Sequence, residues 1–138
     1  MGDSGRWFRT LIVEDNATFR QTLLESLSAR FPAMIIAEAS AGQEVLPKIE
    51  TLLPDLIFMD IKIPGENGLA LTQKIKSRYP EIMVIILTSF DLPEYRQAAY
   101  ERGADYFLVK GSSTNEEILE LVESILSNSG FNLEGSKR

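Results

Sequence analysis

Five short hydrophobic runs recur along the chain, and each is followed by polar residues. Three of the runs show no alternation of apolar and polar positions, which is typical of strands buried on both faces of a parallel sheet. The predicted strands are Phe8–Val13, Met34–Ala37, Leu56–Met59, Ile82–Leu87 and Tyr106–Val109.

The segments between these runs have helical periodicity or consist of good helix formers. Apolar residues from Phe19 to Phe31, for example, recur every four positions and form one buried stripe. The predicted helices are Ala17–Phe31, Glu44–Leu53, Gly68–Tyr79, Leu92–Arg102 and Thr114–Ser127. The chain therefore reads as five βα units, which predicts an α/β fold.

Local signals refine two of these helices. Pro47 has no N–H and fits only the first turn of a helix, so the second helix begins late or is distorted at its start. Ser113 and Glu116 have the spacing of a capping box and mark the start of the last helix. Leu119 and Leu126 widen the apolar stripe of that helix, which favours packing on the sheet over a face shared with a partner subunit.

The length of 138 residues accommodates one domain with a hydrophobic core and not two ordinary ones. We assign this domain to residues 8–127. Residues 1–7 are predicted to be a disordered N-terminal segment, and residues 128–138, rich in Ser, Gly, Asn and charge, a tail or the start of a linker.

Composition excludes several classes of chemistry. The chain has neither cysteine nor histidine, which rules out disulfides, thiolate metal sites, Ser-His and Cys-His catalysis and phosphohistidine. A net charge of −6 argues against nucleic-acid binding by this segment itself. No apolar run approaches the roughly 20 residues that cross a bilayer and no signal peptide is evident, so we expect a cytoplasmic protein that does not bind membranes.

Polar side chains follow four of the predicted strands. Glu14 and Asp15 follow the first strand, Asp60 the third, Thr88 the fourth and Lys110 the fifth. In an open parallel sheet the ligand site lies at the carboxyl ends of the strands. Three carboxylates there require a cation, and oxygen ligands suit Mg²⁺ or Mn²⁺. A hydroxyl and an ammonium can bind phosphoryl oxygens, so the set fits phosphoryl transfer with a carboxylate nucleophile.

Each of these residues alone is more often a helix cap, a turn residue or solvated surface. An acid pair, an acid, a hydroxyl and an amine at four strand ends are far less expected by accident.

Four motifs resemble the receiver domain of two-component response regulators (CheY-like). They are Leu-Ile-Val-Glu-Asp-Asn at 11–16, Phe-Met-Asp-Ile-Lys-Ile-Pro-Gly at 58–65, Leu-Thr-Ser at 87–89 and Gly-Ala-Asp-Tyr-Phe-Leu-Val-Lys at 103–110. The resemblance covers residues 9–127. It implies a three-layer, flavodoxin-like (βα)5 fold with a five-strand parallel sheet of order 2-1-3-4-5.

The resemblance also implies residue roles. Asp60 becomes the phosphoacceptor, and Thr88 and Lys110 become the groups that sense the phosphoryl group. Phe107 takes the place of a switch aromatic, and because phenylalanine cannot donate a hydrogen bond, any switch there is one of packing. The implied Mg²⁺ or Mn²⁺ ligands are Glu14, Asp15, Asp60 and the backbone carbonyl of Lys62.

The chain departs from the family pattern after Lys110, where Gly111 replaces the usual proline. A cis bond before a non-proline residue costs about 2.5–4 kcal/mol, so we expect a trans path or a strained peptide here. The sequence Lys-Gly-Ser-Ser resembles receivers that precede a LuxR/NarL-type DNA-binding domain, which implies a transcriptional output through a C-terminal domain.

The implied function is phosphorylation of Asp60 by a partner sensor histidine kinase, with homodimer formation on phosphorylation. No enzymatic activity is expected beyond self-phosphorylation and autodephosphorylation. One alternative is a stand-alone receiver. Another is a haloacid-dehalogenase-like phosphatase, although that class needs an acid where this chain has Lys62. A nucleotide or flavin carrier lacks its glycine-rich loop, and a passive pseudo-receiver would not need the acid set.

Overall fold

The computed structural model describes residues 7–130, which form a five-stranded parallel sheet in the order β2-β1-β3-β4-β5. Both the predicted fold class and the implied strand order are confirmed. The strands are β1 (Arg9–Val13), β2 (Ile35–Ala39), β3 (Leu56–Met59), β4 (Met83–Thr88) and β5 (Tyr106–Val109). The predicted N-terminal segment, except for Trp7, and the predicted tail beyond residue 130 lie outside the described residues.

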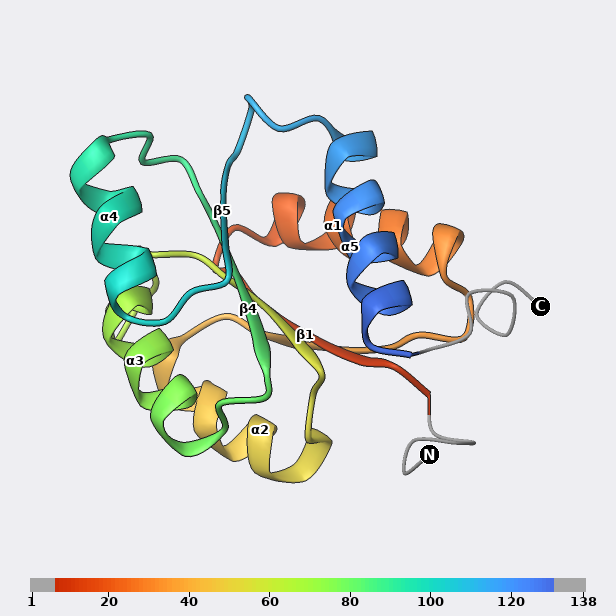
Figure 1. Cartoon of the computed structure of the whole chain (residues 1–138), viewed down its shortest axis with the longest axis horizontal. Coiled ribbons are helices and arrows are strands. Elements are labelled where there is room, and N and C mark those ends of the chain that lie inside the picture. Colours follow the sequence, from red (N-terminus) through yellow and green to blue (C-terminus); the bar gives the residue numbers. More distant parts are fainter. Residues whose placement is uncertain (1–6, 131–138) are drawn as a thin grey trace.

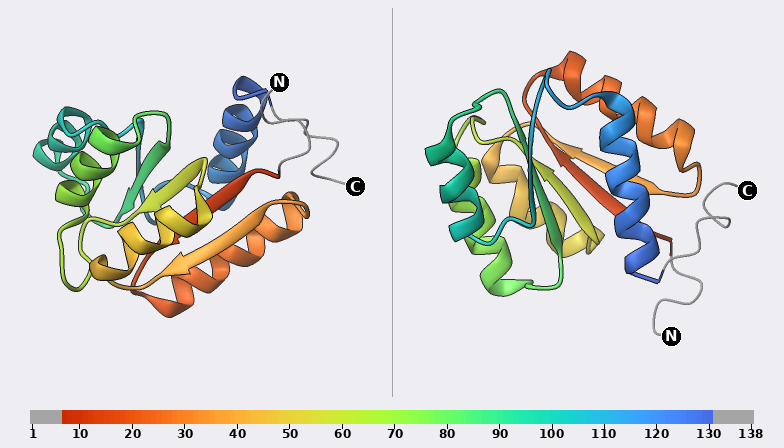
Figure 2. Two further views of the ribbon diagram at one scale, coloured as in Figure 1. Left: turned by 90° about the horizontal axis from the view of Figure 1, so that it is seen from below. Right: turned by 45° about the horizontal axis from the view of Figure 1, so that its top comes forward.

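Helices cover both faces of the sheet and make three layers. One face packs against α1 (Ala17–Arg30) and α5 (Asn115–Asn128), as the views in Figure 1 and Figure 2 show. The other face packs against α2 (Val45–Leu52), α3 (Gly68–Arg78) and α4 (Pro93–Glu101). The boundaries of the five helices agree with the predicted ones to within one residue at both ends.

Each face of the sheet has its own hydrophobic core, which explains why the strand sequences lack alternation. In β3, Leu56 and Phe58 belong to the core under α1 and α5, whereas Ile57 and Met59 belong to the core under α2, α3 and α4. All four side chains are buried, so every position of this strand must be apolar.

In the second βα unit the helix starts late, as predicted, whereas the strand differs from the prediction. The helix α2 begins at Val45 after a 3-10 turn (Gly42–Glu44), which places Pro47 in the first helical turn, as its missing N–H requires. Strand β2 runs to Ala39 rather than Ala37, because Ala39 still pairs with Val13 in the ladder. Glu38 interrupts the apolar run but not the strand.

The predicted cap of α5 is wrong by one residue. Thr114 and Glu117, not Ser113 and Glu116, form the capping box. Ser113 still belongs to the preceding turn, where its amide donates to the Val109 carbonyl. The wide apolar stripe of α5 packs on the sheet as predicted, because Leu119 and Leu126, which widen it, are both buried in the core.

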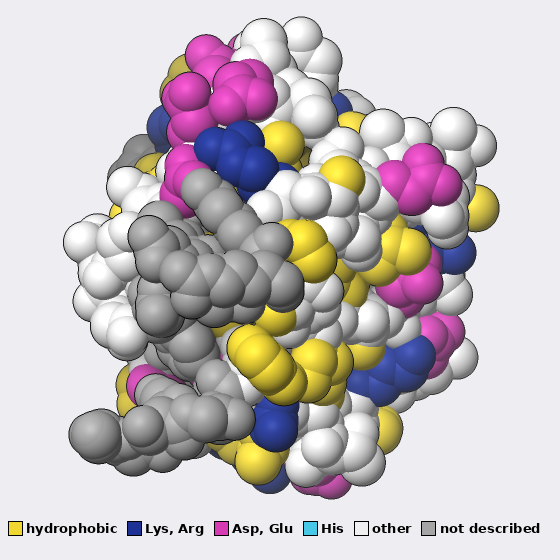
Figure 3. All heavy atoms as spheres, turned by 90° about the vertical axis from the view of Figure 1, so that its right-hand side faces the viewer, with side chains coloured by type: hydrophobic (Ala, Val, Ile, Leu, Met, Phe, Trp, Pro, Cys, Tyr) yellow, Lys and Arg dark blue, Asp and Glu magenta, His cyan; other side chains and the backbone are white. Residues whose placement is uncertain are grey.

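The end of the molecule where the strands begin carries exposed hydrophobic side chains. Trp7, Ile35 and Leu53 are among the large hydrophobic residues with the highest exposure, and each lies at or just before the first residue of a strand. Figure 3 views the side on which β1 begins, where hydrophobic side chains lie between scattered charges. Among the helices of residues 7–130, none has both the length and the hydrophobicity to cross a bilayer.

A glycine joins α3 to the end of β3. The amide of Gly68 donates to the carbonyl of Ile61 at 2.8 Å. A Cβ atom on Gly68 would lie 1.9 Å from the carbonyl oxygen of Asp60, far inside van der Waals contact. The start of α3 therefore approaches the backbone of Asp60 as closely as only glycine permits.

We expect Gly68→Ala to lower the free energy of unfolding by about 2–3 kcal/mol, because the overlap with the Asp60 carbonyl forces the backbone apart. The better helix propensity of alanine, worth about 1 kcal/mol, is too small to offset it. Urea unfolding measures the change. The control Ser77→Ala lies on the exposed side of the same helix and should change stability by less than about 0.5 kcal/mol. A Gly68→Ala variant as stable as the parent chain would contradict the packing argument.

Candidate functional site

Three carboxylates meet at the carboxyl ends of β1 and β3. Each of Glu14, Asp15 and Asp60 offers one oxygen, and these oxygens all lie within 4.8 Å of one another. Glu14 and Asp60 are buried, with only 3% and 6% of their surface exposed, whereas Asp15 is exposed. The predicted grouping of the acids is thus observed, and the exposed acid leaves the cluster open to solvent on one side.

The backbone of the central strands fixes the two buried acids. Val13 pairs with Met59 in the parallel ladder, so Glu14 and Asp60 are the next residues on adjacent strands. The amide of Asp60 donates to the Val13 carbonyl at 3.2 Å, and the amide of Glu14 donates to the Ala39 carbonyl at 2.9 Å. The register of β1 with its two neighbours therefore sets the separation of the acids.

Lys110 supplies the positive charge between the two buried acids. Its Nζ lies 2.6 Å from Oε1 of Glu14 and 2.8 Å from Oδ2 of Asp60. The same ammonium lies 4.6 Å from the centre of the Phe19 ring, a cation–π distance. The other oxygen of Asp60, Oδ1, accepts from the amide of Ile61 at 2.7 Å.

The charges of this cluster shift two pKa values. Burial raises the pKa of Glu14, and the nearby charge of Asp60 adds to the rise, while the hydrogen bond from Lys110 opposes it. Burial lowers the pKa of Lys110, but its hydrogen bonds to Asp60 and Glu14 outweigh this and raise the pKa overall. Lys110 is therefore a cation at neutral pH.

Gly111 determines the path of the backbone directly after Lys110, where the family usually has proline. The peptide bonds of the described residues are all trans, so of the two expected alternatives, a trans path or a strained peptide, the trans path is observed. Gly111 has a φ of 87°, in the left-handed region that favours glycine. The amide of Lys110 donates to the Thr88 carbonyl at 2.8 Å, which ties the end of β5 to β4. Lys110 reaches both acids without a cis bond.

The remaining predicted residues lie on β4, on β5 and in the turn after β3. Thr88 is the last residue of β4, next to β3 in the sheet, and is fully buried. Phe107 on β5 is buried with 4% exposure, beneath the guanidinium of Arg96 at 4.7 Å from its ring centre. Lys62 follows Asp60 by two residues, and its exposed side chain lies over the Phe90 ring. Its backbone carbonyl stays a predicted metal ligand.

Asn16 contacts the Glu14 carboxylate through its main-chain amide, a role that its side-chain type does not indicate in the sequence. The amide of Asn16 donates to Oε2 of Glu14 at 2.9 Å, and the Asn16 side chain caps α1 by accepting from the Phe19 amide. A helix cap was one structural role open to Glu14 and Asp15, but Asn16 fills it. The acids are left free for another role.

The donor set of the cluster suits a hard divalent cation. It consists of carboxylate oxygens, two of them buried, and the lone ammonium of Lys110 cannot neutralise three carboxylates. Mg²⁺ and Mn²⁺ prefer such oxygen ligands. The acidic pocket can therefore bind a metal ion.

The fold and the site define a class of protein: a doubly wound α/β domain with a carboxylate and lysine site at the carboxyl ends of its strands. Residues 10–132 match the family model described as the response regulator receiver domain. The chain therefore belongs to the family of response regulator receiver domains of two-component systems, which are not classical enzymes.

Individual relatives agree with this assignment. The chain is 35% identical over 107 residues to the transcriptional regulatory protein LnrK of Bacillus subtilis (strain 168), covering 78% of this chain and 49% of LnrK. It resembles the CheY-like receiver domain from Methanospirillum hungatei JF-1, with a TM-score of 0.81 and 26% identity over 88% of this chain and 95% of that one.

The receiver domain of the putative regulator NarL from Mycobacterium tuberculosis gives a TM-score of 0.79 at 27% identity, over 88% of this chain and 97% of that chain. The chain spans about half the length of the curated relatives that it matches.

Lys110 and a metal ion compete for the same two carboxylates. We expect Lys110→Met to tighten Mg²⁺ binding about five- to tenfold, because a Coulomb competitor worth about 1 kcal/mol is removed. The same variant should be less stable without metal, since two adjacent carboxylates lose their counter-charge. Isothermal titration calorimetry measures the affinity. The control Lys74→Met removes an exposed lysine of α3 and should leave it unchanged. Weaker Mg²⁺ binding by Lys110→Met would show that the lysine supports the metal site instead.

Proposed function

We propose that Asp60 is the phosphoacceptor of this receiver domain. The observation that carries the proposal is its position, with one carboxylate oxygen 2.8 Å from Lys110 and the acids Glu14 and Asp15 beside it. A nucleophilic carboxylate needs charge compensation for the incoming phosphoryl group. Lys110 provides it on one side of Asp60, and a metal ion held by the acids would provide it on the other.

The metal site of the proposal consists of Glu14, Asp15, Asp60 and the backbone carbonyl of Lys62, with Mg²⁺ or Mn²⁺ as the ion. When bound, the ion offsets negative charge on the phosphoryl oxygens. The part of the protein is to hold the acids in place, and burial of Glu14 and Asp60 keeps competing water away from two of them.

In the transfer step, a carboxylate oxygen of Asp60 forms a bond to phosphorus. The bond from phosphorus to the donor nitrogen of the partner's phosphohistidine breaks, and the electron pair stays on that nitrogen. Lys110 stays close to the new phosphoryl group as a point charge, and the hydroxyl of Thr88 donates a hydrogen bond to it. Hydrolysis of the acyl phosphate on Asp60 would then release inorganic phosphate and restore the free carboxylate.

The proposed output is a change in loops and packing. Attraction of Thr88 toward the phosphoryl group would alter the space next to Phe107, which is buried and cannot form a hydrogen bond of its own. The switch is then a shift between two packings of the β4 and β5 ends and α4, and the altered surface would support a homodimer.

Receiver domains of response regulators interact with histidine kinases, and a sensor histidine kinase is the proposed partner of this chain. We also propose that residues 8–127 are the functional unit, and that residues 128–138 lead to a DNA-binding domain with transcription as output. The solved structure of a DNA-binding response regulator of the LuxR family from Staphylococcus aureus, 27% identical with a TM-score of 0.79, supports this choice. The cytoplasmic location stays a prediction.

The test is phosphorylation by a small phosphodonor. With acetyl phosphate and Mg²⁺ at neutral pH, we expect one acid-labile phosphate per chain. We expect none after Asp60→Asn, because the side-chain amide of asparagine is not a nucleophile. Mass spectrometry of the intact chain measures the added phosphate, and EDTA should abolish it.

The matched control for this experiment is Asp91→Asn, which makes the same change at an exposed aspartate after β4 and should leave labelling intact. Labelling of the Asp60→Asn chain at the parent level would remove Asp60 from the role. Steady release of phosphate from p-nitrophenyl phosphate would favour the phosphatase alternative.

A further inference from the structure

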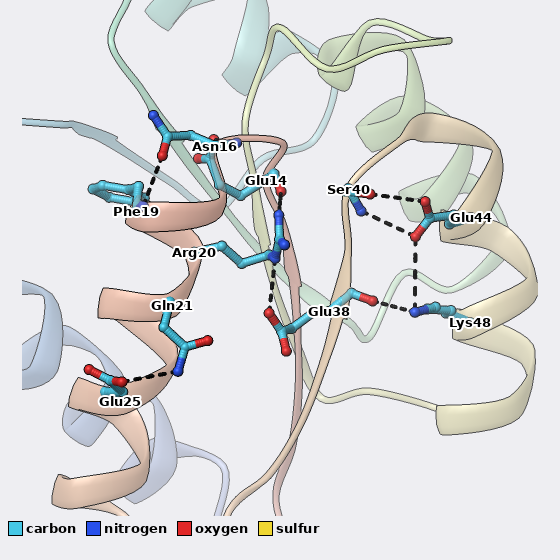
Figure 4. A network of polar contacts seen from close by, with 10 residues as sticks. All are labelled: Glu14, Asn16, Phe19, Arg20, Gln21, Glu25, Glu38, Ser40, Glu44 and Lys48. Atoms are coloured by element: carbon cyan, nitrogen blue, oxygen red, sulfur yellow. Dashed lines mark hydrogen bonds and ion pairs between the residues drawn. The ribbon is translucent and has the colours of Figure 1, made fainter.

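Arg20 connects the metal acids to the edge of the sheet. Its Nη1 donates to the backbone carbonyl of Glu14 at 2.6 Å, and its Nε lies 2.9 Å from Oε1 of Glu38. Figure 4 shows the Arg20 side chain extending from α1 between these two acceptors. One guanidinium therefore joins α1, the end of β1 and the edge strand β2.

The register of the sheet explains why Glu38 is available to Arg20. Glu38 pairs with Ile12, whose side chain lies in the core under α1 and α5. Paired residues of a parallel ladder point to the same face, so the Glu38 side chain is directed toward α1. The carbonyl of Glu38 accepts from Lys48 of α2, which holds this strand from its other side (Figure 4).

Each polar group of Glu14 has a hydrogen-bond partner. Its amide donates to Ala39, its carbonyl accepts from Arg20, and its carboxylate accepts from Lys110 and the Asn16 amide. Of these four partners, Lys110 contacts the acids directly, and Ala39 and Asn16 contact Glu14 through their main chains. Arg20 is the partner that reaches Glu14 from within a helix and that has no other role in the site.

We propose that Arg20 is a positioning residue for the metal site, which fixes the turn carrying Glu14 and Asp15 by clamping the Glu14 carbonyl. The proposal rests on the proposed function, because it assumes that these acids bind the metal. The planar guanidinium suits the task, since it can hold two acceptors on two elements at fixed angles. A lysine at this position would keep the positive charge but would lack the planar set of N–H donors.

Position and charge predict opposite results, which makes the proposal testable. As a mere positive charge, Arg20 would repel a metal ion bound to Glu14 and Asp15, so its removal would tighten binding. As a positioning residue, it favours binding, and its removal would weaken the site. Loss of groups that orient metal ligands typically lowers metal affinity about 10- to 100-fold.

The experiment compares Arg20→Lys and Arg20→Met in the 138-residue chain. Electron paramagnetic resonance of Mn²⁺ measures its affinity, and competition with Mn²⁺ gives that of Mg²⁺. We expect both variants to bind Mn²⁺ about tenfold more weakly than the parent chain. Circular dichroism establishes that each variant is folded at the temperature used, so that lost affinity is not lost structure.

The matched controls are Arg30→Lys and Arg30→Met. Arg30 lies at the other end of α1 and forms ion pairs with Glu116 and Glu123 of α5, so these variants lose two helix contacts away from the site. Their Mn²⁺ affinity should equal that of the parent chain.

Three results would overturn the proposal. If Arg20→Lys binds Mn²⁺ as the parent chain does and Arg20→Met binds it equally or more tightly, Arg20 acts only through its positive charge. Equal losses in the Arg30 variants would make the effect one of general stability. Failure of the parent chain to bind Mn²⁺ would overturn both this proposal and the metal site of the proposed function, whereas the first two results would leave that function standing.

Discussion

The repulsion between the buried carboxylates of Glu14 and Asp60 is the constraint on which the rest of the site depends. Two like charges in a partly buried position destabilise each other unless a cation lies between them. Lys110 is that cation here, in contact with both acids. Under the proposed function, a metal ion and a phosphoryl group would change this charge balance, and the lysine would gain another negative group to contact.

The strand order dictates how this cation is delivered. β5 is separated from β3 by β4, and neighbouring strands lie about 4.8 Å apart, so the end of β5 is about 10 Å from that of β3. A long side chain is therefore needed at position 110, and the residue that ends the intervening strand is the short Thr88. The positive φ of Gly111 turns the chain directly after the lysine. Lys110, Thr88 and Gly111 together thus allow the lysine ammonium to reach the acids at the end of β3.

Sequence patterns predicted the elements and the acids because both depend on local rules. Buried strands are apolar runs, and residues that follow parallel strands meet at one edge, so Glu14, Asp60 and Lys110 could be grouped in advance. The strand order could not be obtained this way, because five βα units are compatible with other orders, and it came from the family resemblance. The end of β2 was missed because Glu38 interrupts the apolar run. In the structure Glu38 is part of the strand, and its side chain forms an ion pair with Arg20 of α1.

Two of the contacts that could not be predicted have a common physical origin, since they involve the backbone carbonyls of the acids themselves. Gly68 at the start of α3 packs on the carbonyl of Asp60, and Arg20 in the first turn of α1 binds the carbonyl of Glu14. In each case the helix that follows an acid returns to hold the acid's own peptide group. A carboxylate whose backbone is fixed cannot relax away from its neighbour, so both helix starts keep the repelling pair together. If the proposal for Arg20 holds, the packing of α1 and α3 contributes to cation binding together with the acids.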